Sequence, residues 1–413
     1  MDIRRLIHER PVAFASLAAA VGLCLGAVLT LAFVSAPPAP APDPTPTISP
    51  VVETPSAITF TPVAFDALEG WSADPLDEIL PALKRSCDRI ANDTDETMGD
   101  GPAARPMAAW RTACGRVLQA SGDVGAFRAA IAAAFTPHRI STAAGDEGTF
   151  TGYYEATLNG SLSPTATFKY PLYAPPPDLI SVTLKDFVPT IGAGTPATLV
   201  GRVDGRRLKP YFVRADIDAD AFRDRAEVVA WIDDPVAVHI LHIQGSGQVS
   251  LPNGEMIRVG FAAHNGHAFT GLGKILLDEK VLKPGEASMI GVRDWLRRNP
   301  DRAVTLMNRN ARYIFFRRIE GDGPIGAEGV ALTRLRSLAV DPRATPLGAP
   351  VWVETADPDN LPLNRLMMAQ DVGAAITGAV RGDVFWGAGD AAFDKAARMK
   401  SKGRLTVLLP RTN

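Results

Sequence analysis

Two aspartates in the C-terminal third have the surroundings of groups that could do acid–base chemistry. Asp371 opens a run of glycine and aliphatic residues that ends at Gly378, and Asp383 follows Gly382 and precedes the apolar run Val384–Trp386. A carboxylate in an apolar setting is costly to bury unless it is paired or protonated, so its pKa is expected to rise. Both aspartates are therefore candidate proton donors, and a turn aspartate bonded to its own backbone is the structural alternative for each.

Arg381 bears directly on that chemistry. It lies two residues before Asp383, so the two side chains share a face if this segment is a strand. A guanidinium against the carboxylate would lower its pKa and weaken it as a donor near neutral pH. We expect Arg381 to turn away, or to pair with another carboxylate such as Asp341 or Asp371.

Other motifs do not support a cofactor or a metal. The segment Gly266–Lys274 resembles a phosphate-binding loop, but Ala268 stands where its first glycine is required. His264 and His267 have no evident third ligand, and the two cysteines outside the N-terminal apolar run cannot complete a zinc site. We expect no cofactor and no metal, and we expect the 266–274 segment to be a binding loop.

The elements that must position these residues are mostly short strands. Frequent glycine and proline favour β structure with tight turns. Helices are expected at 76–92, 107–119, 124–135, 220–231 and 287–298. Strands are expected at 150–158, 168–173, 236–244, 255–261, 313–317, 331–334, 350–354, 365–369, 382–385 and 404–409, with turn signals at Asn159-Gly160 and Asn253-Gly254.

Cys87 and Cys114 lie on the apolar faces of the first two expected helices. In an oxidising compartment such a pair is a disulfide candidate, and two buried free thiols are the alternative.

The composition bounds the class of protein. The 413 residues are 46% hydrophobic and 21% charged, and the formal net charge is −2. These values are ordinary for a globular protein, and the length favours two globular units. The charge gives no reason to propose nucleic-acid binding, which requires a clustered basic surface.

The N-terminus carries an export signal. An uncharged stretch runs over residues 11–36 after Arg4, Arg5 and Arg10, which is long enough to span a bilayer with the N-terminus in the cytoplasm. We expect residues 1–36 to be an uncleaved signal anchor, with a cleaved signal peptide or a lipoprotein at Cys24 as alternatives. The proline-rich residues 37–70 read as a spacer.

Separated motifs resemble the membrane-bound lytic murein transglycosylase A family, in the family's order. They are Phe150–Glu155, Ile243–Gly247 and His264–Phe269 with Gly273-Lys274, followed by three segments that resemble its three-aspartate (3D) domain: Ala339–Asp341, Gln370–Gly378 and Gly382–Gly387. The resemblance covers roughly residues 76–409.

The resemblance implies a mainly β fold, with a double-psi β-barrel domain built from residues 71–155 and 321–413 and an inserted β domain at 156–320. It implies a catalytic Asp383, supported by Asp371 and Asp341, in a groove that holds a glycan strand. The expected substrate-binding residues, from motifs predicted to face that groove, are Thr151, Tyr153, Tyr154, Gln244, Gly245, Ser246, Lys274, Gln370 and Trp386.

The implied activity is that of a periplasmic lyase, an exotransglycosylase on peptidoglycan. It cuts the β-1,4 bond between N-acetylmuramic acid and N-acetylglucosamine and leaves a 1,6-anhydro end. Because the sugar's own 6-hydroxyl attacks, one carboxyl group suffices as acid and then as base, whereas a hydrolase needs two. The alternatives are a non-catalytic wall-binding protein and a glycan hydrolase on the same barrel. The expected partners are glycan strands, the inner membrane and candidate wall-synthesis or division proteins.

Overall fold

Six strands close into a ring in the structure, a computed structural model that describes residues 57–188, 198–219, 222, 224–321 and 323–412. Neighbouring strands in the ring are hydrogen-bonded, and the last pairing, between β5 and β18, closes it. Going round, the members are β18 (Lys400–Pro410), β15 (Pro350–Ala356), β16 (Pro362–Asp371), β14 (Ser337–Val340), β17 (Arg381–Ala388) and β5 (Gly148–Ser161).

Alternating side chains fill the inside of this ring. Phe150, on β5, is fully buried and lies against glycines on two other strands. A Cβ on Gly382 would come within 2.6 Å of the Phe150 ring, and one on Gly403 within 2.9 Å. The next residues along the strands, Thr151 and Asp383, therefore point away from the interior, because successive side chains alternate between faces.

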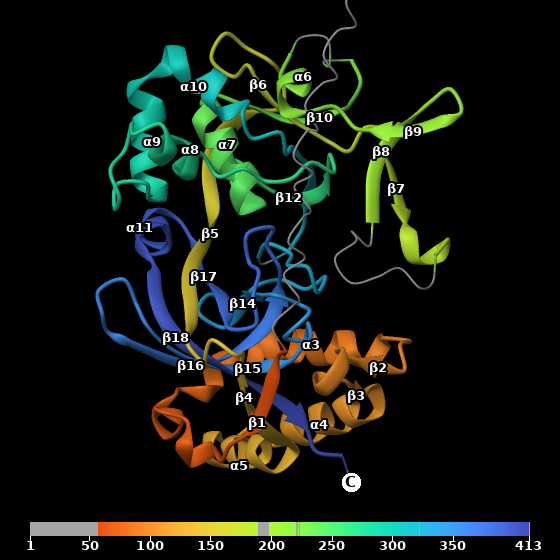
Figure 1. Ribbon diagram of the computed structural model, residues 1–413, viewed down its shortest axis with the longest axis vertical. Helices are drawn as coiled ribbons and strands as arrows, with labels where there is room; N and C mark the ends of the chain where they lie inside the picture. The colour runs from red at the N-terminus through yellow and green to blue at the C-terminus, as the bar shows by residue number, and fades with distance from the viewer. Residues whose placement is uncertain (1–56, 189–197, 220–221, 223, 322, 413) are drawn as a thin grey trace, which may run out of the picture. The chain divides into compact units, whose positions relative to one another are not determined.

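Helices cover one end of the ring. They are η3 (Leu76–Ile79), α3 (Leu80–Asn92), α4 (Met107–Gln119) and α5 (Val124–Ala134), at the bottom of Figure 1, and they confirm the three helices predicted there. Short elements accompany them: η1 (Phe65–Ala67), η2 (Trp71–Ala73), η4 (Gly101–Ala103), β2 (Thr97–Met98) and β3 (Arg105–Pro106). Cys87 on α3 and Cys114 on α4 form a disulfide with a Cα–Cα distance of 5.6 Å. Strands β4 (Phe135–Ser141) and β1 (Thr59–Pro62) extend the sheet beyond β18.

The second half of β5 leaves the ring and enters another set of elements (Figure 1). Its strands are β6 (Tyr170–Tyr173), β10 (Val228–Ile232), β11 (Ser246–Ser250), β12 (Met256–His264) and β13 (Ile314–Ile319), and a separate sheet holds β7 (Ile180–Thr183), β8 (Thr198–Asp204) and β9 (Arg207–Pro210). Its helices are η5 (Leu184–Asp186), α6 (Arg214–Ile217), α7 (Pro235–Gln244), α8 (Leu272–Asp278), α9 (Met289–Arg298) and α10 (Pro300–Met307). The segment expected to be a β domain is thus a mixture of strands and helices.

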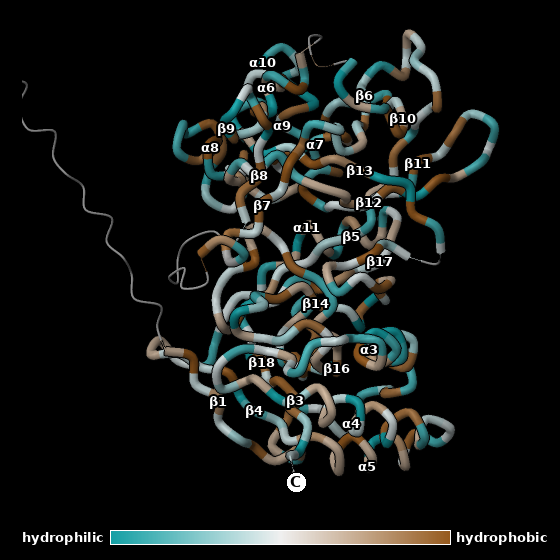
Figure 2. Tube along the Cα trace, turned by 90° about the vertical axis from the view of Figure 1, so that its right-hand side faces the viewer, coloured by the Kyte–Doolittle hydropathy of each residue, from teal (hydrophilic) through white to brown (hydrophobic). Residues whose placement is uncertain are grey.

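Residues 236–244, predicted as a strand, form helix α7, and that prediction was wrong. The Asp234 side chain accepts a hydrogen bond from the Val236 N–H at 2.8 Å, Pro235 occupies the first turn, and Gly245 ends the helix with φ 78°. These are ordinary start and stop signals. The run of β-branched residues looks like a strand because a helix buried on most sides is largely apolar, and Figure 2 shows hydrophobic colour along much of α7.

Three smaller predictions were also wrong. The end of the helix expected at 220–231 is strand β10, while residues 220, 221 and 223 lie outside the described part. The turn expected at Asn159-Gly160 is absent because β5 continues to Ser161. Gly160 is needed there because a Cβ would lie 2.4 Å from Val249. The strand expected at 331–334 is reduced to an isolated bridge between Ile325 and Ala331.

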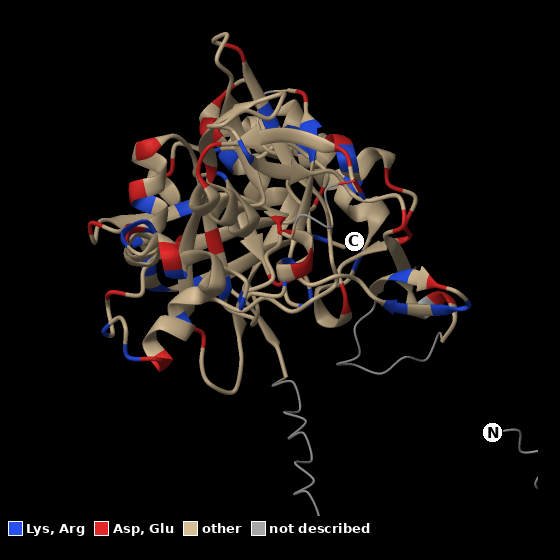
Figure 3. Cartoon of the chain, turned by 90° about the horizontal axis from the view of Figure 1, so that it is seen from above, with Lys and Arg blue, Asp and Glu red and all other residues tan. Residues whose placement is uncertain are grey.

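The mainly β class and the remaining predicted strands and the helix at 287–298 are confirmed, within a few residues at each end. Acidic and basic residues are interspersed over the elements in Figure 3, in keeping with the net charge of −2. No helix among the described residues is long and apolar enough to cross a membrane. The predicted anchor and most of the predicted spacer lie outside the described residues.

Candidate active site

Asp371, Asp383 and Thr151 lie in one row across four neighbouring strands. Asp383 on β17 is paired in register with Thr151 on β5 and with Ala339 on β14, and Ala339 is paired with Asp371 on β16. One strand therefore separates the two aspartates, which places their backbones roughly 10 Å apart at the usual strand spacing. Ala339 lies between them in the pairing and is buried.

The Asp383 carboxylate is held by a hydroxyl that is itself held by a guanidinium. Thr151 Oγ1 donates to Asp383 Oδ1 at 2.5 Å, and Arg381 Nη2 donates to Thr151 Oγ1 at 2.8 Å. Asp383 is half-buried, and burial raises its pKa to about 6. The hydrogen bond from Thr151 and the charge of Arg381 oppose that rise, while the charge of Asp371 adds to it.

Arg381 makes no bidentate contact with Asp383. Its other hydrogen bonds go to the carbonyl oxygens of Thr149 and Gly382. The prediction that it avoids such a contact is confirmed. The suggestion that it pairs with Asp341 or Asp371 was wrong, because Thr151 and the two carbonyls take its hydrogen bonds.

Asp371 is held by backbone groups. Its Oδ1 accepts the N–H of Ala327 at 3.0 Å and the N–H of Val372 at 2.9 Å. Burial raises its pKa to about 6 despite these bonds. The buried hydroxyl of Tyr153 lies near both aspartates without meeting hydrogen-bond geometry, and burial together with their charges raises the pKa of Tyr153.

Asp341 has a different environment. It is buried, but its oxygens accept hydrogen bonds from the Arg343 guanidinium and from the N–H groups of Arg343 and Gly378. Burial alone would raise the pKa, and these bonds outweigh it, so the pKa of Asp341 lies below its usual value. Because Gly378 lies in the loop between β16 and β17, the ionised Asp341 fixes that loop.

Apolar residues surround the row on the same face. Tyr153, Phe385, Ala339, Leu332 and Ile376 form a buried cluster separate from the main core. The rings of Tyr153 and Phe385 lie 5.2 Å apart. This cluster supplies the desolvation that raises the two aspartate pKa values.

The motif from Gln244 to Ser246 supports strand β5. Gln244 Oε1 accepts the N–H of Tyr154 at 3.0 Å, Gly245 ends α7, and Ser246 is buried at the start of β11. Tyr154 lies on the opposite face of β5 from Thr151 and Tyr153. Lys274 lies on α8, where it is exposed and forms an ion pair with Asp278.

Gln370 and Trp386, both predicted to bind substrate, are buried in the protein, as are Tyr153, Tyr154 and Ser246. Gln370 is 0% exposed, and its amide bonds Ala82, Ser86 and Ser337. Trp386 is 4% exposed, and its Nε1 donates to the Met399 sulfur. Motif membership does not encode which face of a strand a residue occupies, and the pairing of β17 with β5 also shifts register between Phe385 and Ala388.

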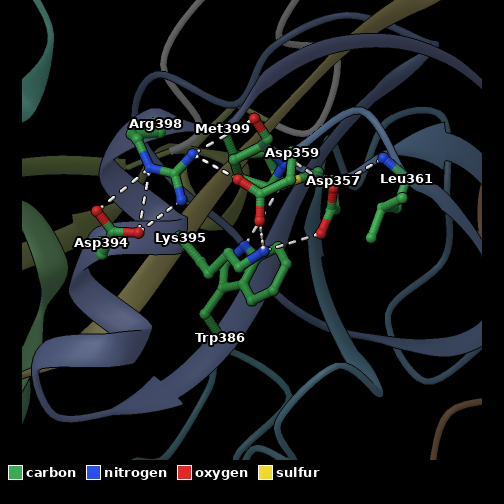
Figure 4. A network of polar contacts seen from close by, with 9 residues as sticks. Asp357, Asp359, Leu361, Trp386, Asp394, Lys395, Arg398 and Met399 are labelled. Carbon is green, nitrogen blue, oxygen red and sulfur yellow. Dashed lines mark hydrogen bonds and ion pairs between the residues drawn. The ribbon is translucent and has the colours of Figure 1, made fainter.

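Helix α11 (Asp390–Arg398) covers Trp386 and is fixed by a charged network (Figure 4). Lys395 pairs with Asp357 and Asp359 on the turn after β15, and Arg398 pairs with Asp359 and Asp394. A Cβ on Gly152 would lie 2.6 Å from Trp386 Nε1. Because Gly152 shares a face of β5 with Phe150, Trp386 and α11 pack on the face of the strand opposite to Thr151.

The turn Gly326–Gly329 was not foreseen as part of the site. It supplies the Ala327 N–H to Asp371, and the N–H of Glu328 bonds the carbonyl of Gln370. Two glycines three residues apart were the only available signal, since a Cβ on Gly326 would lie 2.4 Å from the Gln370 carbonyl oxygen. Glu328 is buried against Ser86, and burial raises its pKa to about 7.

His264 and His267, the two histidines near the 266–274 segment, each form a hydrogen bond with the backbone. His264 Nδ1 accepts the Gly266 N–H, and His267 Nε2 lies 2.8 Å from the Tyr211 carbonyl oxygen. Across the described ranges, no three histidine, cysteine or acidic side chains form a set that could hold a metal.

Comparisons with known proteins point to one family. A family model described as the MltA specific insert domain matches residues 149–317, and one described as the 3D domain matches residues 336–409. The crystal structure of MltA from Neisseria gonorrhoeae is 32% identical, with a TM-score of 0.73 over 86% of this chain and 94% of that chain. The membrane-bound lytic murein transglycosylase from Agrobacterium tumefaciens is 30% identical, with a TM-score of 0.74 over 86% and 98%.

A curated relative, membrane-bound lytic murein transglycosylase A of Escherichia coli (strain K12), is 29% identical over 268 residues. That match covers 63% of this chain and 65% of the relative. The chain therefore spans just under two thirds of the length of this relative.

Proposed function

Because the chain belongs to the membrane-bound lytic murein transglycosylase A family, we propose that it cleaves the glycan strands of peptidoglycan as a lytic transglycosylase. The bond cut is the β-1,4 link between N-acetylmuramic acid and N-acetylglucosamine, and the product is a 1,6-anhydromuramic end. The observation that carries the proposal is the half-buried Asp383, whose pKa is raised to about 6 and whose carboxylate is positioned by Thr151.

Asp383 first donates a proton to the departing glycosidic oxygen. A pKa of about 6 leaves roughly a tenth of the Asp383 side chains protonated at pH 7, whereas an ordinary aspartate would be almost fully ionised. The resulting carboxylate then takes the proton of the sugar's 6-hydroxyl as that oxygen closes the anhydro ring. Positioned proton transfer of this kind contributes about 10²–10⁴-fold to a rate.

Asp371 supports this chemistry through its charge. It lies in the same row as Asp383, and its charge raises the pKa of that residue. Its hydrogen bonds to two backbone N–H groups hold it in place on the same face of the sheet. A hydrolase would require a second carboxylate across the sugar from the acid.

The ring of six strands supports the proposal that the barrel is of the double-psi type. Two of its pairings, β14 with β16 and β17 with β5, are parallel, and the others are antiparallel. We also propose that the protein acts in the periplasm on the membrane, because relatives are named as membrane-bound and residues 11–36 form an apolar run. Extraction of the full chain from membranes by detergent, and not by carbonate, would support the anchor, and release by carbonate would contradict it.

Digestion of purified sacculi tests the activity. The products are separated and weighed, and the wild-type chain is expected to release muropeptides with anhydro ends. Reducing ends would show a hydrolase, and intact sacculi would show a binding protein, and either result overturns the proposal. An Asp383→Asn variant keeps the shape of the side chain but cannot exchange the proton, so its rate is expected to fall by about 10²–10⁴-fold. Full activity in this variant would refute the role of Asp383.

A further inference from the structure

The turn Gly326–Gly329 is fastened to the end of strand β16 at two consecutive residues. The Glu328 N–H donates to the Gln370 carbonyl oxygen at 3.0 Å, and the Ala327 N–H donates to Asp371 Oδ1 at 3.0 Å. A hydrogen bond to a carboxylate favours its ionised form, so the Ala327 bond lowers the pKa of Asp371 against the larger effect of burial. The position of this turn therefore bears on the charge of a site aspartate.

The side chain of Glu328 anchors the turn to helix α3. It is 9% exposed, and its Oε2 accepts a hydrogen bond from Ser86 Oγ at 2.7 Å. Ser86 Oγ accepts in turn from Gln370 Nε2 at 2.9 Å, and Gln370 Oε1 accepts from Ser337 Oγ at 2.5 Å. A hydroxyl has one hydrogen to donate, so these bonds run in one direction and end on Glu328, which must be an acceptor.

Packing alone does not account for a carboxyl group at this position. Gly348, with φ 89°, leaves space for it, because a Cβ there would lie 2.8 Å from Glu328 Oε1. Burial raises the pKa of Glu328 to about 7, and the charge of Arg89 on α3, which is bonded to Asp93, opposes that rise. A carboxyl group is costlier to bury than an apolar side chain of similar size, whereas only a hydrogen-bond acceptor can hold the turn on Ser86.

We propose that Glu328, through its bond to Ser86, positions the turn that bonds Asp371. Glu328 is thus a positioning residue that acts on Asp383 only through Asp371, and the inference rests on the proposed function of Asp383. Loss of the Ala327 N–H would raise the pKa of Asp371 and leave that residue less charged near neutral pH. Because the charge of Asp371 raises the pKa of Asp383, the pKa of Asp383 would then fall.

Carboxyl ¹³C NMR on the full chain in detergent measures both aspartate pKa values directly. Aspartate is labelled, and Asp371→Asn and Asp383→Asn assign the two signals. In Glu328→Ala we expect the pKa of Asp371 to rise by at least about 0.5 and that of Asp383 to fall. Ser86→Ala, which removes only a hydroxyl, should shift them in the same directions and is the second variant if Glu328→Ala unfolds. Glu328→Gln is neutral like the protonated acid and still accepts from Ser86, so it should keep both values.

Glu354→Ala is the matched control. Glu354 is also 9% exposed, and both of its carboxyl oxygens accept hydrogen bonds. It lies on β15 opposite Asn364, at the far end of β16 from Asp371. Its loss should lower the melting temperature without moving either aspartate pKa.

Kinetics on purified sacculi supply a second readout. Glu328→Ala is expected to lower kcat at pH 7 severalfold with KM unchanged, because a buried residue makes no contact with the glycan. The decrease of kcat on the alkaline side should move to lower pH, since the pKa of Asp383 is lower. A folding defect alone would reduce the amount of active enzyme without moving the profile.

The outcomes separate the two proposals. Unchanged aspartate pKa values in both Glu328→Ala and Ser86→Ala would overturn the inference, and so would equal shifts in Glu354→Ala or in Glu328→Gln. The NMR measurement needs no substrate. If the values shift as expected and the wild-type chain releases no anhydro products, only the proposed function fails. If the products are released and the values do not shift, only the positioning role of Glu328 fails.

Discussion

Thr151 donates its hydroxyl hydrogen bond to Asp383 across the register pair that joins β5 to β17, at 2.5 Å. The same hydroxyl oxygen accepts from Arg381, so the positive charge reaches the carboxylate through one intervening group. This arrangement moderates the pKa of Asp383 without neutralising the residue by a direct ion pair.

Removal of that hydroxyl is expected to change both the rate and its pH dependence. The hydrogen bond stabilises the ionised carboxylate, so Thr151→Ala raises the pKa of Asp383 above about 6. In a plot of kcat against pH, the decrease on the alkaline side reflects loss of the acid's proton. This decrease should therefore move to higher pH in Thr151→Ala. Loss of positioning should lower kcat by roughly tenfold to a hundredfold, the effect of one charge-assisted hydrogen bond. Thr151→Ser keeps the hydroxyl and is the control; a Thr151→Ala profile that coincides with the control would contradict the assigned role.

Asp371→Asn is expected to alter stability only above acidic pH. The folded-state pKa of Asp371 is raised from 3.8 to about 6, so its contribution to stability is present below pH 3.8 and is lost as the pH rises through about 6. An asparagine never ionises and can still accept both backbone bonds. The variant should therefore be more stable than wild type at pH 8, by on the order of 1–2 kcal/mol, and equal to it near pH 3.5. Urea unfolding at the two pH values measures this, and a gain of the same size at both would exclude ionisation as the cause.

Gly382→Ala places a methyl group inside the ring. The new Cβ would lie 2.6 Å from the Phe150 ring and 3.1 Å from Leu338, so the core must shift. Overpacking of this kind costs about 1–3 kcal/mol. Thermal denaturation should show the loss, and a Gly382→Ala/Phe150→Leu double variant should recover part of it. No loss in the single variant would mean that the ring interior is more open than these distances indicate.

The disulfide between Cys87 and Cys114 should stabilise the helical end of the ring. The bridge closes a loop with a sequence separation of 27, for which the loss of unfolded-state entropy is worth about 3.5 kcal/mol. Urea unfolding with and without reductant measures the difference. A double Cys87→Ala/Cys114→Ala variant, which reductant cannot affect, is the control, and a wild-type chain insensitive to reductant would contradict the prediction.

The sequence indicated the elements of the ring better than those between β5 and β14. Strands such as β15 and β17 show β-rich runs bounded by turns, so pattern alone locates them. The prediction of a strand at 236–244 failed because a buried helix and a buried strand share the same apolar composition. Only the caps of α7, at Asp234 and Gly245, distinguish the two.

For the site, the motifs and their order along the chain predicted Asp383 and Thr151 as site residues. The strand register in the structure then places both in one row with Asp371. Pattern could not reveal that Gln370 and Trp386 face inward, since a shift of one residue along a strand exchanges the two faces. The sequence could not predict that Ala327 contacts Asp371, because Ala327 donates through its backbone N–H, a group that every residue except proline possesses.

The closure of the ring between β5 and β18 has a consequence for local unfolding. Residues 149–151 of β5 are paired on both edges, by β17 and by β18, whereas residues 156–159 are paired in register with β11 alone. Amide hydrogens in a doubly paired stretch exchange with solvent only through large, costly openings. Thr151 therefore belongs to a segment expected to be among the slowest to exchange, and the strand loosens only beyond it, toward residues 156–159.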